Sequence, residues 1–221
     1  MARDKKKFSR SPASFGRREA VRDPRPLILI VCEGECTEPY YLDGLRRDLG
    51  LSNVQVAGKE CGSDPASVVQ YALKRQEQDK FEHIFCVVDR DEHQSFDQAI
   101  KLVRASADAG IPIEIIPSYP SFEFWYILHF QFTRAPIIRT GNTSSGANAV
   151  RVLKKHMKPH GGYEKSQINM WDHLKTDLPQ AIKNSRQARN QAAEVGELNP
   201  STDVDKLVSF LFRNSGLDEP N

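Results

Sequence analysis

Three acidic residues follow apolar runs that are typical of buried strands. Glu33 comes directly after the run at 27–32, and Asp89 and Asp91 come after the run at 83–88. Side chains two residues apart point the same way in an extended segment, so Asp89 and Asp91 can present both carboxylates on one side. Grouped carboxylates repel one another unless a cation lies between them, and Mg²⁺ is a hard cation that takes oxygen ligands. The pattern indicates a divalent-metal site, with a turn cap or a solvated loop as the alternative.

A basic segment stands later in the chain. It contains no Asp or Glu between Arg139 and Tyr163, and its five cations are Arg139, Arg151, Lys154, Lys155 and Lys158. A basic helix bordered by glycine-containing loops can bind the phosphate backbone of a nucleic acid. The alternative is a solvated helix beside a loop. Arg186 and Arg189, three residues apart on a later predicted helix, would extend this basic surface.

Two pairs of residues have spacings that metal ligands can have. His156 and His160 are four residues apart, but Pro159 between them ends the helix and no third ligand is evident. Cys32 and Cys36 have no matching His or Cys pair nearby. Neither pair predicts a metal site of its own. The four scattered cysteines instead favour free thiols and a reduced, cytoplasmic location.

The charge of the chain is distributed unevenly. The 221 residues carry a formal net charge of +2, yet residues 1–25 hold nine of the 31 basic and three of the 29 acidic residues. This segment is +6 and the remainder is −4. Its composition predicts a disordered basic arm that contacts phosphates, or a solvated tail without a specific partner. There is no apolar run of about 18 residues and no apolar signal segment at the start, so the sequence predicts no membrane association.

The apolar pattern predicts alternating strands and helices. The expected strands are 27–32, 53–58, 83–88 and 112–117, and the expected helices between them are 36–50, 63–78 and 95–110. Thr37, Ser63 or Asp64, and Gly110 are the expected helix-end residues. This order is typical of an α/β fold, with a parallel sheet flanked by helices on both faces.

Further helices are expected after this unit, at 121–130, 149–163, 176–194 and 200–212, the last of them capped by Ser201 or Thr202. We therefore divide the chain into a disordered arm (1–25), an α/β core (26–132) and a helical C-terminal extension packed on the core (133–221). Ligands of open α/β sheets bind at the carboxyl ends of the strands. Glu33, Asp89 and Asp91 are consequently expected to converge at one edge of the sheet.

The strand-end acids resemble a known catalytic domain. "VCEG" after the first strand and "VVDRD" after the third resemble the Toprim domain, which occurs in topoisomerases, primases and OLD-type nucleases. With "EGECTEPYYL", "PSFEFWYILHF" and "NPSTDVDKLV", the chain resembles the RloB-like proteins over about 27–212. That group is associated with bacterial restriction and phage-defence loci. One departure is visible, because Tyr119 stands where an asparagine is expected before "PSFE", with Ser118 as the nearest polar residue.

The resemblance implies roles for individual residues. It makes Glu33 the Toprim glutamate, a general acid or base, and makes Asp89 and Asp91 the metal-binding pair. Glu38 and Glu123 are further acids that would complete a second metal site, or first-turn acids that interact with a helix dipole. His93 is a proton shuttle or a surface residue.

The leading functional hypothesis is a nuclease that uses Mg²⁺ or Mn²⁺ to hydrolyse the phosphodiesters of DNA or RNA, tRNA included, as an effector of anti-phage defence. The alternative is a non-catalytic nucleic-acid-binding or adaptor subunit of an ATPase-containing defence complex. The chain has no GxxxxGK[ST] motif, so any ATPase would be a separate partner. A third hypothesis is phosphoryl transfer on nucleotides.

Overall fold

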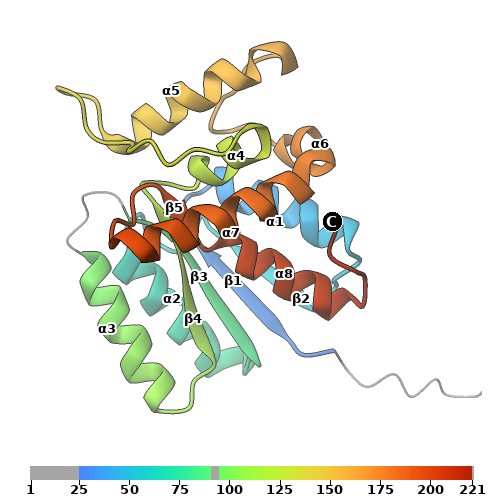
Figure 1. Cartoon of the computed structure of the whole chain (residues 1–221). Helices are drawn as coiled ribbons and strands as arrows, with labels where there is room; N and C mark the ends of the chain where they lie inside the picture. Colours follow the sequence, from blue (N-terminus) through green and yellow to red (C-terminus); the bar gives the residue numbers. More distant parts are fainter. Residues whose placement is uncertain (1–24, 91–94, 221) are drawn as a thin grey trace, which may run out of the picture.

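A five-stranded, mostly parallel sheet forms the centre of the protein (Figure 1). We describe it from a computed structural model that covers residues 25–90 and 95–220. The strands are β1 (Ile28–Cys32), β2 (Val54–Ala57), β3 (His83–Asp89), β4 (Ile113–Tyr119) and β5 (Ser201–Thr202), in the order β2-β1-β3-β4-β5. The first four are parallel and agree with the predicted strands. Every residue of β1 is buried, as expected for a strand covered on both faces.

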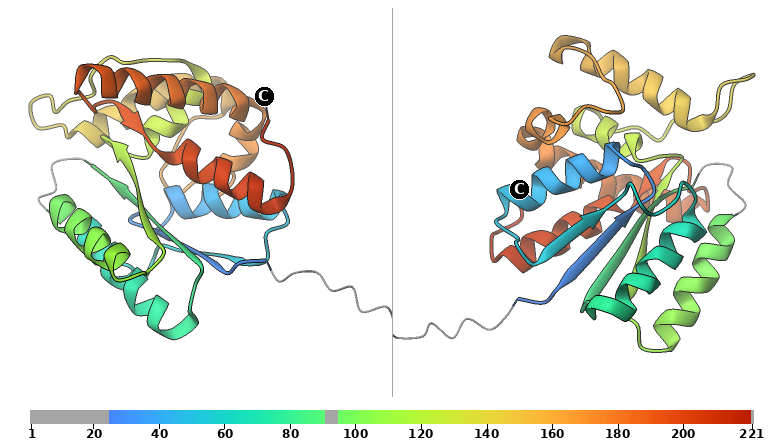
Figure 2. Two further views of the ribbon diagram at one scale, coloured as in Figure 1. Left: turned by 60° about the horizontal axis from the view of Figure 1, so that its bottom comes forward. Right: turned by 180° about the vertical axis from the view of Figure 1, so that it is seen from behind.

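Helices cover both faces of the sheet, as the sequence predicts. Figure 2 shows α2 (Pro65–Asp79) and α3 (Ser95–Asp108) on one face, and α1 (Thr37–Asp48) and α8 (Val204–Ser215) on the other. Alternate strand residues supply the two cores, because successive side chains of a strand point to opposite faces. Leu29, Val31, Cys86 and Val88 pack with α2 and α3, whereas Ile28, Ile30, Phe85 and Val87 pack with α1 and α8.

The helix ends agree only in part with the predicted caps. Asp64 caps α2 as predicted, because its side chain accepts hydrogen bonds from the backbone N–H groups of Ala66 and Ser67. Gly110 follows α3 with a φ of +82°, which a glycine adopts without a steric penalty. The prediction that Thr37 caps α1 is wrong: Cys36 holds that position, and no side chain closes this helix end.

The short strand β5 is a feature that the sequence did not predict. It runs antiparallel to the end of β4, with Ser118 opposite Thr202, and the two hydroxyl oxygens lie 2.8 Å apart. Asp203, rather than Ser201 or Thr202, holds the N-cap position of α8, although the Thr202 hydroxyl accepts a hydrogen bond of 3.2 Å from the backbone N–H of Val204 at the start of that helix. Because β5 pairs with β4, a segment far along the chain completes the sheet. Ser118, the polar neighbour of Tyr119, is buried in this contact.

A second group of helices lies beyond one end of the sheet (Figure 1). It consists of α4 (Glu123–Phe130), α5 (Ser145–Met157), a 3₁₀ turn (Lys158–His160), α6 (Met170–Leu174), a second 3₁₀ turn (Lys175–Asp177) and α7 (Leu178–Val195). The short α6 was not predicted. Residues Glu123 to His129 of α4 are all buried, and one apolar cluster joins α4, α5 and α7 to the strands of the sheet. Within the described ranges, no helix has the length and apolar character needed to cross a membrane.

Candidate functional site

Glu33 and Asp89 meet where two neighbouring strands end. The Glu33 backbone N–H donates to the Val87 carbonyl at 3.1 Å, and Glu33 Oε2 accepts from the Asp89 backbone N–H at 3.0 Å. From this point β1 leads to α1 on one face of the sheet, whereas β3 leads towards α3 on the other. Such a divergence opens a ligand-binding crevice in α/β sheets. The predicted convergence of Glu33 with Asp89 is confirmed, while Asp91 and His93 lie outside the described residues.

Asp89 also ties this crevice to the start of α4. Its Oδ1 atom accepts a hydrogen bond of 2.9 Å from the backbone N–H of Phe122. That bond joins the end of β3 to the residue directly before Glu123. Glu123 is 2% exposed, so its carboxylate is buried beside the strand ends.

Glu38 projects from the first turn of α1 into the same region. Its side chain is 4% exposed, and its Oε2 atom is buried without a hydrogen-bond partner. Gly34 makes room for it, since a Cβ atom at position 34 would lie 2.1 Å from this oxygen. Gly58 in turn fits closely against the loop, because a Cβ there would lie 2.6 Å from the Gly34 carbonyl oxygen. A side chain at position 34 would therefore displace the carboxylate of Glu38 from its place.

Three residues that the sequence did not single out contact Glu123. The Ser121 hydroxyl donates to Glu123 Oε2 at 2.6 Å, and the Tyr163 hydroxyl lies 3.3 Å from Glu123 Oε1. Lys165 places its Nζ atom 3.5 Å from the same Oε1 atom. Tyr163 and Lys165 belong to an irregular segment between Gly162 and α6, where no hydrophobic period marks which side chains point inward. Only its place in the "PSFE" motif, two residues before Glu123, could have indicated a role for Ser121.

The acids at the strand ends and helix starts line one cavity of about 350 Å³. It is lined by Glu33, Gly34, Glu35, Cys36, Thr37, Glu38, Ser63, Asp89, Glu123 and Lys165. The acids come from the ends of β1 and β3 and from the first turns of α1 and α4. Five of the lining side chains are carboxylates and one is an amine, so the cavity has an excess of negative charge.

Burial and mutual repulsion favour the protonated carboxyl groups. Burial raises the pKa of Asp89 well above its usual range, and Glu38, Glu123 and Glu33 raise it further. Burial likewise raises the pKa of Glu38 to about 7, with a further contribution from Glu123. The pKa of the Lys165 amine is also raised, chiefly by Glu123 and further by Asp89. For an amine, a raised pKa favours the charged form. A cation that enters the cavity would relieve this repulsion.

The chemistry of the donor set fits a hard divalent cation. Mg²⁺ takes carboxylate oxygens, and the partnerless Glu38 oxygen is an available donor. However, among residues 25–90 and 95–220 no three His, Cys, Asp or Glu side chains are already grouped closely enough to hold a metal ion. Ligation by the described acids would therefore need side-chain movement or a contribution from the 91–94 segment. His156 and His160 instead lie against the Phe130 ring, with ring centres 5.4 and 5.8 Å away.

The cations of α5 form one exposed stripe. Arg151, Lys154, Lys155 and Lys158 are all exposed, and their spacing of three, four and seven residues places them on one helical face. Arg139 is also exposed, in the segment that precedes α5. The opposite side of α5 is apolar, and Ala149, Leu153 and Met157 are buried against the rest of the protein.

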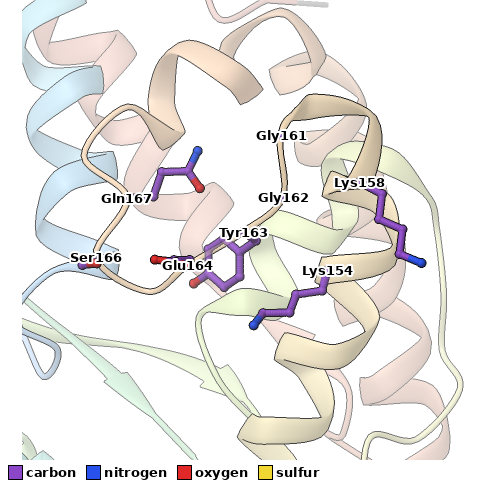
Figure 3. Close-up of a pocket in the computed structure, with 8 residues that line it drawn as sticks. All are labelled: Lys154, Lys158, Gly161, Gly162, Tyr163, Glu164, Ser166 and Gln167. Carbon is purple, nitrogen blue, oxygen red and sulfur yellow. The ribbon is translucent and has the colours of Figure 1, made fainter.

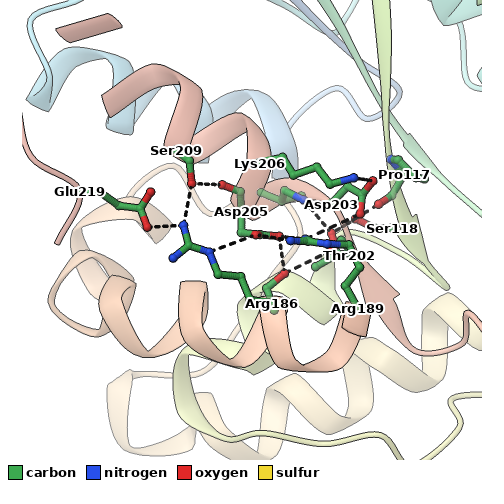
Figure 4. Close-up of polar contacts among 12 residues, drawn as sticks. Pro117, Ser118, Arg186, Arg189, Thr202, Asp203, Asp205, Lys206, Ser209 and Glu219 are labelled. Carbon is green, nitrogen blue, oxygen red and sulfur yellow. Dashed lines mark hydrogen bonds and ion pairs between the residues drawn. The ribbon is translucent and has the colours of Figure 1, made fainter. Parts of the chain in front are cut away.

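Arg186 and Arg189 lie elsewhere, in a polar network between α7 and α8 (Figure 4). Arg189 forms a two-pronged ion pair with Asp205, which is 1% exposed, and one of its two contacts measures 3.0 Å. Arg186 contacts Asp205 at 3.8 Å and Glu219 at 2.5 Å. These arginines line a cavity that shares no residue with those lined by the α5 lysines. The structure therefore does not place these two arginines beside the cations of α5, where the sequence predicts them, and it gives both of them carboxylate partners.

The fold and site define an α/β protein with a mostly parallel sheet and an acidic cavity at the divergence of β1 and β3. A family model described as RloB-like protein matches residues 28–211. The chain belongs to this RloB-like family. No curated protein and no solved structure matches it.

Proposed function

We propose that this protein is a divalent-metal-dependent nuclease with a Toprim-like site. The observation that carries the proposal is the acidic cavity, which is lined by carboxylates from the ends of β1 and β3 and from the first turns of α1 and α4, and in which a buried oxygen of Glu38 lacks a partner. An Asp-x-Asp pair that begins at the last residue of β3 supports the same reading, and so does the position of the cavity at the carboxyl ends of the strands.

The proposed roles follow from the position of each side chain. Asp89 and Asp91 would hold Mg²⁺ or Mn²⁺, with Glu38 and Glu123 as further ligands. A bound metal would neutralise the phosphate and lower the pKa of a bound water. Glu33, fixed by the Asp89 backbone N–H, would accept or return a proton at its carboxylate.

Lys165 adds a mobile positive charge to this site. Its side chain is 68% exposed although its amine reaches Glu123, so the amine can leave that carboxylate and meet a substrate phosphate. In the absence of substrate it partly offsets the charge of the acids. His93 remains a candidate proton shuttle from the sequence.

The biological setting is proposed from the resemblance to defence-associated proteins. We propose a role as the effector of an anti-phage system that acts on DNA or RNA, tRNA included, with a separately encoded ATPase as partner. The alternative, a non-catalytic adaptor that binds nucleic acid, is favoured by one observation: the described acids are not already grouped around a single metal position.

Cleavage assays separate these two functions. Purified protein is incubated with Mg²⁺ or Mn²⁺ and with labelled DNA and RNA, beside the variants Asp89→Asn and Asp91→Asn. Each variant should lower the cleavage rate by about 100-fold or more, because it removes a charged metal ligand. Asp108→Asn, at the exposed end of α3, is the matched control and should cleave like the wild type. Cleavage that survives both substitutions would refute the proposed site, whereas binding without cleavage at any metal concentration would favour the adaptor.

A further inference from the structure

Three cavities lie next to one another, and each shares lining residues with the next. The acidic cavity shares Asp89 and Lys165 with a second cavity of about 450 Å³. The second shares Lys154 and Glu164 with a third cavity of about 610 Å³. We call the second and third cavities together the α5 groove. They are lined by Asp89, Ser121, Ser144, Gly146, Ala147, Val150, Lys154, Lys158, Gly161, Gly162, Tyr163, Glu164, Lys165, Ser166 and Gln167.

The α5 groove has mixed polar and apolar walls and carries amines along its length, beside the acids Asp89 and Glu164. Figure 3 shows the outer cavity between Lys154 of α5, with Lys158 of the following 3₁₀ turn, and the segment that holds Glu164 and Gln167. Lys165 stands at the inner end, where the groove opens into the acidic cavity. Amines spaced along a groove suit a chain of phosphates, since each amine can meet one negative charge.

The depth of the carboxylates decides which nucleic acid can reach them. Glu38 and Glu123 are 4% and 2% exposed, so a scissile phosphate must enter the cavity rather than pass over its mouth. A duplex is stiff, with a persistence length of about 50 nm, and both strands would have to approach together. An unpaired strand bends freely and can place one phosphate at the floor while its neighbours remain in the groove.

We infer that the α5 groove binds an unpaired nucleic-acid strand and leads it to the acidic cavity. The inference rests on the proposed nuclease function for the fate of the strand, but binding to the groove does not require cleavage. Lys154 and Lys158 contact phosphates away from the cut, and Lys165 contacts the phosphate beside it. Unpaired DNA and unpaired RNA share this backbone chemistry, and the experiment distinguishes them.

The test measures binding without cleavage. Full-length protein is titrated, in Ca²⁺ and in EDTA, with labelled single strands of DNA and RNA and with the matching blunt duplexes, and fluorescence anisotropy is recorded at several salt concentrations. Single strands should bind about tenfold more tightly than duplexes. The double variant Lys154→Glu/Lys158→Glu should weaken single-strand binding by about tenfold and flatten the slope of log K against log salt by about 1.4, at about 0.7 for each lost phosphate contact.

A charge-matched control removes the effect of net charge. Lys74→Glu/Lys101→Glu changes two exposed lysines of α2 and α3, on the other face of the sheet. This control should change affinity much less than the groove variant. Equal losses in the two double variants, or duplexes that bind as tightly as single strands, would overturn the inference.

Cleavage data keep the two proposals apart. Groove-dependent single-strand binding without metal-dependent cleavage would leave the α5 groove in place and refute the nuclease. Asp89-dependent cleavage of duplexes that is unchanged in the Lys154→Glu/Lys158→Glu variant would support the nuclease and refute the role of the α5 groove.

Discussion

Replacing Glu38 by glutamine tests whether the acidic cavity destabilises the metal-free fold. The pKa of Glu38 rises from an ordinary 4.5 to about 7, chiefly because the carboxyl group is buried. A folded-state pKa that is raised in this way means that the folded protein holds the proton to higher pH than the unfolded chain. The free energy of unfolding should therefore fall between about pH 4.5 and pH 7, by roughly 3 kcal/mol for this group.

The assay is urea unfolding in EDTA at pH 4.5 and at pH 8. Above pH 7 the wild type carries the penalty of a buried charge, whereas Glu38→Gln carries none. The difference in free energy of unfolding, variant minus wild type, should be roughly 3 kcal/mol more favourable at pH 8 than at pH 4.5. Comparing the two pH values cancels any constant cost of the buried amide.

Glu35→Gln is the matched control, because Glu35 is an exposed acid at the rim of the same cavity and stays hydrated on folding. It should not reproduce the gain of Glu38→Gln at pH 8. If Glu38→Gln has the same effect on stability at both pH values, burial of the Glu38 carboxyl group does not oppose its ionisation. The argument for a cation in the cavity would then lose its electrostatic basis.

Three further predictions follow from named contacts. In thermal scans, millimolar Mg²⁺ should raise the melting temperature of the wild type more at pH 8 than at pH 6, because Glu38 and Asp89 keep protons at the lower pH. Asp89→Asn should reduce this gain in melting temperature. Gly34→Ala should displace the Glu38 carboxylate and abolish this metal-dependent gain, whereas Gly146→Ala, with its nearest contact at 3.7 Å, should retain it. Arg189→Ala should destabilise the protein by up to about 3 kcal/mol in urea unfolding, because the buried Asp205 loses the closer of its two arginine partners, yet it should leave nucleic-acid affinity unchanged. A loss of affinity without a loss of stability would contradict the structural role.

Local sequence patterns determined the central sheet and part of the site. Continuous apolar runs specified β1 and β3, and the helices between the first four strands followed from their period and from caps such as Asp64. Parallel strands end at a common edge, so the positions of Glu33 and Asp89 after β1 and β3 were enough to predict their meeting. The signal was sufficient for the strands and helices because each of them depends on neighbours a few residues away, and the parallel topology then brings Glu33 and Asp89 together.

Tertiary structure alone decided the remaining parts of the site. Lys165 and Tyr163 reach Glu123 across about 40 positions of the chain, from a segment without a hydrophobic period. Arg189 has the charge of a phosphate-binding residue, yet its guanidinium group is paired with the buried carboxylate of Asp205. Strand β5 forms because Ser201 and Thr202, more than 80 positions further along the chain, pair with the edge of β4. Each outcome depends on which distant segments pack together, and periodicity, propensity and charge spacing carry no information about that choice.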